Sequence, residues 1–154
     1  MTFIKALAGN FPLIAASVTI LLAQLVKVPI VFITQRIWNP QLGFSTGGMP
    51  SSHSAAVTSL ATAIGIQEGL SSVAFAIAVV IAAITMFDAQ GIRRHAGIHA
   101  SLINRLMTTG DRVETDGYTH KALKELLGHK PIEVVVGALF GIVSSLLIYG
   151  LFYY

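Results

Sequence analysis

Cysteine is absent from the 154-residue sequence, which excludes disulfide bonds, zinc–thiolate sites and a thiol nucleophile. Charge is also scarce, since Asp, Glu, Lys and Arg make up 11% of the chain, whereas a soluble domain carries about 25%. Hydrophobic residues make up 54%. A chain of this kind has too few charged side chains to cover a water-facing surface. The composition therefore predicts an integral membrane protein, with one domain over residues 1–154.

Four segments predict an all-α membrane bundle with about four transmembrane helices, because a helix needs about 20 apolar residues to cross a bilayer. The second segment is less hydrophobic, and its Ala, Ser and Thr residues suit close helix packing. The last one contains Gly137 and Gly141, a pair that allows a close helix contact but is common by chance. The expected spans lie at about residues 13–34, 52–66, 73–88 and 131–152.

Residues 89–130 form a polar interfacial region that holds most of the charge and has no apolar run of spanning length. Within it we expect an interfacial helix from Ile92 to about Met107. A polar loop to His120 and a short amphipathic helix over residues 121–127 should follow.

The basic residues indicate the orientation of this multi-pass protein in the cell membrane. With four spans, the loops at residues 35–50 and 89–130 lie on one side, and they carry every lysine and arginine except Lys5 and Lys27. Cytoplasmic loops carry an excess of Lys and Arg, so we expect both loops in the cytoplasm and both termini outside. The net charge of +3 is then explained by basic cytoplasmic loops that contact anionic lipid headgroups. We therefore expect no nucleic acid partner.

A polar hinge from Gly47 to Ala55 (GGMPSSHSA) directly precedes the second segment. Glycines such as Gly48 bring backbone amides close to a ligand, Pro50 stops any preceding helix, and a serine can cap the next one. This construction suits an anion such as phosphate at a helix N-terminus. An ordinary loop with a serine cap is the alternative.

An up-and-down order of the spans places three polar segments on one membrane face. They are the hinge, residues 88–95 at the end of the third span and residues 128–133 at the start of the fourth. Lys27 and Arg36 come from, or directly follow, the distal half of the first span, on the same face. Ionisable groups are costly in a membrane and often functional, so we expect these segments to form one site.

Each candidate side chain has a simpler structural role as its alternative. His53 could be a capping or interfacial histidine. His129 and Glu133 are four residues apart, so on a helix the carboxylate could hold the imidazole in one tautomer, or it could complement the helix dipole. Arg93 and Arg94 suit bidentate phosphate binding, or they anchor the chain at the membrane surface.

Asp88 ends an apolar span, where an unpaired carboxylate is costly. We expect it to pair with Lys27 or with one of the two neighbouring arginines. His95 and His99 are four residues apart and, with Asp88, could be argued as a metal site. Two histidines at helical spacing are more often not a site, so we expect no metal and no cofactor.

Three blocks in order carry a resemblance to a known family, from about Phe11 to Gly150. The blocks are GGMPSSHSAAVTSLATAIG, TMFDAQGIRRHAG and LKELLGHKPIEVVVG, and KVPIVFI precedes them. They resemble the divergent family of small membrane proteins related to acid phosphatases and vanadium-dependent haloperoxidases. This family is a distant branch of the type 2 phosphatidic-acid phosphatases.

The resemblance assigns roles through the three motifs of the larger superfamily. Residues 50–53 (PSSH) are similar to the second motif, proline-serine-glycine-histidine, with Ser52 in place of glycine. His129 and Glu133 resemble the histidine of the third motif and the aspartate four residues after it. Lys27 resembles the lysine that opens the first motif.

Two phosphate-binding arginines of the superfamily are missing from their expected places. Seven residues after Lys27, where the first motif has arginine-proline, this chain has Thr34. The serine-arginine positions of the third motif are Ala122 and Leu123. The superfamily fold usually has six core helices, so the resemblance implies a trimmed core or completion by a second copy, as in a homodimer.

The resemblance implies a lipid-phosphate phosphatase with its site at the cytoplasmic face. His129 would attack phosphorus, Glu133 would orient it, and His53 would protonate the leaving oxygen and later activate water. The expected phosphate-binding residues are Lys27, Ser51, Ser52, Arg93 and Arg94, supported by Asp88, His95 and Gly48. The alternatives are a non-hydrolytic phospholipid or polyprenyl-phosphate binding or transport protein, and a small structural membrane subunit.

Overall fold

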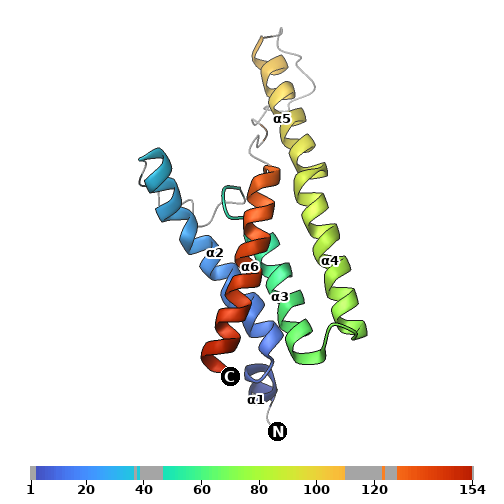
Figure 1. Ribbon diagram of the computed structural model, residues 1–154. Helices are drawn as coiled ribbons and strands as arrows, with labels where there is room; N and C mark the ends of the chain where they lie inside the picture. Colours follow the sequence, from blue (N-terminus) through green and yellow to red (C-terminus); the bar gives the residue numbers. More distant parts are fainter. Residues whose placement is uncertain (1–2, 37, 39–46, 110–122, 124–127, 154) are drawn as a thin grey trace.

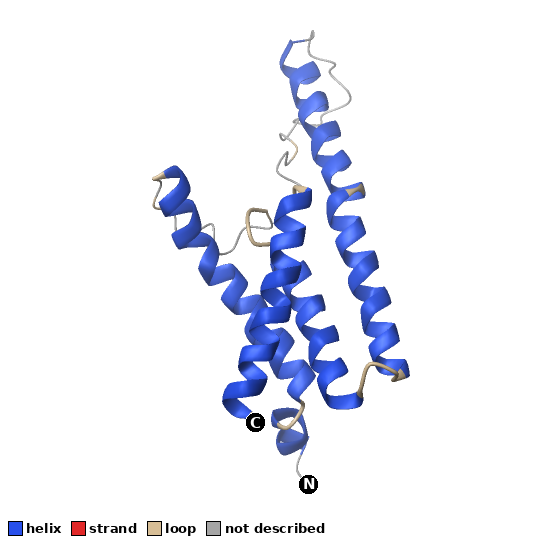
Figure 2. Cartoon of the chain, in the orientation of Figure 1, coloured by secondary structure: helices blue, strands red, loops and turns tan. Residues whose placement is uncertain are grey.

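The computed structural model describes residues 3–36, 38, 47–109, 123 and 128–153. In this part of the chain every regular element is a helix, and Figure 2 shows no strand there. The all-α prediction is therefore confirmed. The helices are α1 (Phe3–Ala8), α2 (Phe11–Gln35), α3 (Ser52–Glu68), α4 (Val73–Gln90), α5 (Ile92–Thr109) and α6 (Pro131–Phe152).

Helix α3 is the centre of the bundle, because α2, α4 and α6 all pack against it (Figure 1). Its buried residues are all Ala, Ser or Thr, whose small side chains allow neighbouring helices to approach closely. Three helical stretches of the described residues are long and apolar enough to cross a membrane: Phe11–Thr34, Val73–Met107 and Pro131–Phe152. The expected span at 52–66 is not among them, since α3 has 17 residues and a polar buried face. Three of the four expected spans are therefore found by length and composition, and a membrane crossing by α3 stays a prediction.

Two glycines bring α6 into direct contact with the backbone of α3. A Cβ atom on Gly137 would lie 2.5 Å from the carbonyl oxygen of Ser51, and one on Gly141 would collide with Thr58. Across the same contact, the Thr58 hydroxyl donates a hydrogen bond to the carbonyl of Ala138 (3.0 Å). The close helix contact predicted from the two glycines is confirmed.

Both chain termini lie at one end of the bundle (Figure 1), and the side chains described there are apolar and aromatic. Phe11, Ala15, Ala63 and Ile148 form a buried cluster there. The ring of Phe11 also lies 5.4 Å from that of Tyr149. Amphipathic aromatic rings are typical of membrane–water interfaces, so this end matches one membrane boundary.

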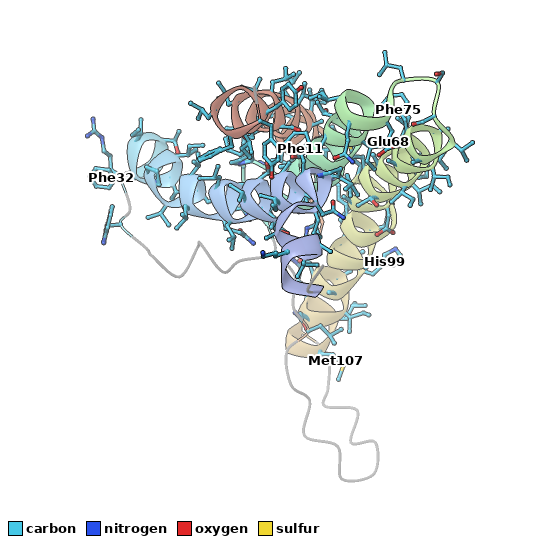
Figure 3. All side chains as sticks on the ribbon, turned by 90° about the horizontal axis from the view of Figure 1, so that it is seen from below. Phe11, Phe32, Glu68, Phe75, His99 and Met107 are labelled. Carbon is cyan, nitrogen blue, oxygen red and sulfur yellow. The ribbon has the colours of Figure 1, made fainter. Side chains whose placement is uncertain are left out.

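Helices α4 and α5 form one long rod with Gly91 between them (Figure 1). The expected interfacial helix from Ile92 to about Met107 corresponds to α5. Among the described helices, α5 packs against α4 alone. Seen from below, Met107 lies on the part of α5 that extends away from the other helices (Figure 3). The loop to His120 and the helix at 121–127 fall outside the described residues, apart from Leu123.

Candidate functional site

The three polar segments identified in the sequence meet at the end of the bundle opposite the termini. The backbone N–H of His129, before α6, donates to the carbonyl of Ala89 in the last turn of α4 (3.0 Å). The N–H of Ser51, before α3, donates to the carbonyl of Glu133 in α6 (3.0 Å). The ring centroids of His53 and His129 are 6.3 Å apart, with an interplanar angle of 77°. The predicted convergence of these segments is confirmed.

The hinge ends in a capped helix, as the sequence indicates. The Ser51 Oγ accepts hydrogen bonds from the Ser54 N–H (3.3 Å) and the Ser54 hydroxyl (3.0 Å). Gly48 has φ 89°, which side chains rarely adopt, while the space around its Cβ position is open. Glycine is therefore required there for backbone conformation, and this conformation leads the chain into the buried residues Ser51 and Ser52.

The two histidines occupy comparable positions at the starts of two helices. His53 lies in the first turn of α3 and is half-buried. His129 is 5% exposed and lies directly before Lys130, the N-cap of α6. Gly128, with φ 85°, makes the turn that precedes it. The N-termini of α3 and α6 therefore converge, and both contribute partial positive charge at the histidines.

Glu133 caps α6, and it does not share a helix face with His129. Its Oε2 accepts the N–H of Lys130 (3.1 Å). Because α6 begins at Pro131, His129 lies outside the helix, and the spacing rule for residues four apart on a helix does not apply. The helix-terminal role of Glu133 is confirmed, and its role in orienting the imidazole stays a prediction.

Lys27 brings a positive charge into the bundle from α2. Its side chain is 2% exposed and is the largest of the fully buried side chains in the described part of the chain. Lys27 interacts electrostatically with Glu133, whose carboxylate also caps α6. A buried ammonium group is very costly without such compensation. This interaction relates Lys27 to the start of α6, and its phosphate-binding role stays a prediction.

The other predicted site residues lie around the junction of α4 and α5. Asp88 is half-buried beside Ala89, and its pairing stays a prediction. Arg94 and His95 are exposed in the first turn of α5, so they belong to the helix after the third expected span. The side chain of Arg93 is outside the described part of the structure. Their phosphate-binding and supporting roles also remain predictions.

Within the described residues, no three His, Asp or Glu side chains lie together in a way that could hold a metal ion. Asp88, His95 and His99 therefore do not form such a group. The chemical character of the site comes instead from two imidazoles, one ammonium group and two helix N-termini. This combination can bind an anion and exchange protons with it.

Two residues of the site lie within the predicted polar segments but were not singled out as site residues from the sequence. Gly128 could have been found, because a glycine directly before His129 indicates a turn with positive φ. Ala89 contributes only its backbone carbonyl to His129. A backbone contact between distant segments has no signature in side-chain chemistry, so this residue could not have been found.

Comparisons with known proteins give one matching family and one similar protein. The model of the family described as the Divergent PAP2 family matches residues 8–144. The uncharacterized membrane protein YuiD of Bacillus subtilis (strain 168) is 48% identical over 151 residues, which cover 92% of this chain and 96% of that protein. No solved structure matches the chain.

Proposed function

Because this chain belongs to the Divergent PAP2 family, we propose that it is a membrane lipid-phosphate phosphatase that uses a histidine nucleophile. The family resemblance stated from the sequence blocks is thereby confirmed, whereas the activity is our inference. The observation that carries it is the pair His53 and His129, whose ring centroids are 6.3 Å apart. The buried Lys27 interacts with Glu133, which lies four residues after His129 in the chain.

The reaction would proceed in two displacements at phosphorus. A ring nitrogen of His129 forms a bond to phosphorus while the bond to the lipid oxygen breaks, and His53 gives its proton to that oxygen. His53 then takes a proton from water, whose oxygen attacks the phosphohistidine and releases inorganic phosphate and the free His129. His53 belongs to α3 and His129 to the turn before α6, so the two rings come from different segments. This arrangement suits attack and proton transfer on opposite sides of one phosphoryl group.

Charge on the equatorial oxygens would be stabilised by Lys27 and by the N-terminus of α3. Ser51 was expected to bind phosphate, but its N–H is bonded to the Glu133 carbonyl and its Oγ caps α3. In our proposal the amide of Ser52 therefore replaces it. Arg93 and Arg94, from the start of α5, would supply the cationic charge that the family motifs place elsewhere.

The substrate would be a lipid of the cytoplasmic leaflet, because the positive-inside rule assigns the basic loops next to the site to the cytoplasm. Phosphatidic acid, phosphatidylglycerol phosphate and a polyprenyl diphosphate all present a terminal phosphoryl group of the required kind. A homodimer that adds helices to this small bundle remains part of the proposal.

The test is phosphate release by the purified protein in detergent–lipid micelles with these three lipids. We expect His129→Ala to reduce release to background and His53→Ala to lower it by about 10²–10⁴-fold, the usual contribution of a general acid. His99→Ala is the matched control, since His99 is exposed on α5, away from both rings, and should retain activity. Full activity in His129→Ala would exclude the mechanism.

A second candidate function is binding or transport of lipid phosphates without hydrolysis. One observation favours it: Thr34, at the first motif's arginine position, is exposed, and its hydroxyl donates to the Ile30 carbonyl of its own helix (2.8 Å). The same purified protein distinguishes the two functions. Saturable binding of a lipid phosphate that His129→Ala preserves, with no phosphate release by the unmodified protein, would indicate the binding protein.

A further inference from the structure

Aromatic side chains lie near both ends of the bundle, where membrane boundaries are expected, and α4 is long enough to span a bilayer core without α5. Tyr149 and Phe11 mark the end near the termini. At the other end Trp38 is 68% exposed, and its ring meets Phe32 edge-on at 5.7 Å. Tryptophan and tyrosine concentrate at the membrane–water interfaces. The 18 residues of α4 extend about 27 Å, close to the hydrocarbon thickness of about 30 Å.

Helix α5 therefore lies beyond the hydrocarbon core when it continues straight from α4. The stretch Val73–Met107 contains 35 residues, about 52 Å of helix and thus about 20 Å more than a bilayer core needs. Figure 1 shows this rod extending well past the start of α6. A straight rod would project α5 into water.

One side of α5 is unsuited to water. Ile98, Leu102 and Leu106 follow one another at intervals of four residues and are 47%, 53% and 71% exposed. On another side, the Asn104 side chain makes two hydrogen bonds with the backbone of Leu123, donating to its carbonyl (2.8 Å) and accepting from its N–H (2.9 Å). The apolar row is thus a separate surface of α5 from the one that meets the rest of the chain.

The charge of α5 identifies what covers this row. The sequence of α5 contains three arginines and no acidic residue, and Arg94 and Arg105 are both exposed. A helix with an apolar row, whose charged residues are all basic, is typical of binding to anionic lipid surfaces. A basic helix is poorly suited to packing against a second copy of itself, because like charges would meet.

We propose that α5 lies on the surface of a membrane containing anionic lipids. The row Ile98, Leu102 and Leu106 lies at the boundary between headgroups and acyl chains, and the arginines of α5 contact the anionic headgroups. In this arrangement the rod of Figure 1 would bend at Gly91, where α4 ends and the backbone leaves helical geometry (φ −93°, ψ −92°). The carbonyl of Ala89, which holds His129, lies on the α4 side of this bend. Surface binding of α5 is therefore compatible with an intact site, and it is independent of the proposed phosphatase activity.

The absence of cysteine allows a direct test with single labelled cysteines in the full-length protein. Leu102→Cys and Leu106→Cys place an environment-sensitive fluorophore on the apolar row, and Ser101→Cys places it on a different side of α5. Each protein is inserted into bilayers of phosphatidylcholine with phosphatidylglycerol. Quenching is then measured with acrylamide in the water and with spin-labelled lipid in the membrane.

We expect lipid quenching and protection from acrylamide at positions 102 and 106, and weaker lipid quenching at 101. Strong acrylamide quenching at 102 and 106 would show a straight helix in water and overturn the proposal. Protection from both quenchers would show that protein covers the row, which would also overturn it.

The role of anionic lipid is tested by Arg105→Gln combined with the label at position 102. One basic residue near an anionic surface contributes about 1 kcal/mol, so the equilibrium constant for surface binding should fall about fivefold. Replacing phosphatidylglycerol by phosphatidylcholine should weaken lipid quenching in the same direction. Unchanged quenching in both experiments would overturn the assignment to anionic headgroups.

Discussion

The two ends of the bundle are held together by different kinds of contact. At the end with the two histidines, backbone hydrogen bonds join α3 to α6 through Ser51 and α6 to α4 through His129. At the other end, apolar and aromatic side chains such as Phe11 and Ile148 form a buried cluster. Backbone bonds fix position, whereas apolar packing tolerates exchange of similar side chains. We therefore expect substitutions at the first end to affect activity and those at the second to affect mainly stability.

The largest effect is expected from Gly137→Val, because the new side chain would collide with the backbone of Ser51. Overpacking of this kind costs about 1–3 kcal/mol or more, and here it would separate α3 from α6 and thus His53 from His129. We expect loss of phosphate release together with a lower thermal unfolding midpoint, measured by circular dichroism. Gly150→Val is the matched control in the same helix, since the space around Gly150 is open. Equal losses in both variants would contradict the importance of the close contact.

A smaller effect is expected from Lys27→Met, which keeps the length of the buried side chain and removes its charge. Removal of one group that stabilises charge in the transition state usually lowers the rate by about 10²–10³-fold. Glu133 would retain its bond to Lys130, so the fold should persist. The rate of phosphate release and circular dichroism measure the two effects separately. Lys5→Met is the control, because Lys5 is an exposed lysine near the other end of the bundle, and it should leave the rate unchanged. A full rate of phosphate release in Lys27→Met would exclude Lys27 from the mechanism.

The smallest effect is expected at the other end, from Phe11→Leu. The substitution keeps an apolar side chain but removes the ring contacts with Tyr149 and Tyr153, at 5.4 and 4.7 Å between centroids. Aromatic pairs contribute about 0.5–1.5 kcal/mol, so the free energy of unfolding should fall by about 1 kcal/mol in a denaturant titration. The rate per folded molecule should not change. A lower rate without a change in stability would show that the two ends are not distinct in the way described.

The sequence predicts the helices of this fold well where long apolar runs specify them, as in α2 and α6. It also predicts the convergence of the site, because the order of the spans alone places the three polar segments at one end. The role of α3 was harder to predict, because Ala, Ser and Thr are compatible both with a membrane span and with a central packed helix. The relation of His129 to Glu133 depends on where α6 begins. Pro131 starts the helix after His129, so spacing alone gave the wrong geometry.

The hydrogen bond from His129 to Ala89 has a mechanical consequence. Ala89 lies two residues before Gly91, where α4 ends and after which α5 begins. The backbone carbonyl that accepts the hydrogen bond of His129 is therefore close to the junction of the two helices. Any bend of the rod at Gly91 begins within one helical turn of that bond. Tilting of α5 would therefore displace the backbone next to the hydrogen bond between Ala89 and His129. A label near the end of α5 would thus report a motion that can change the position of His129.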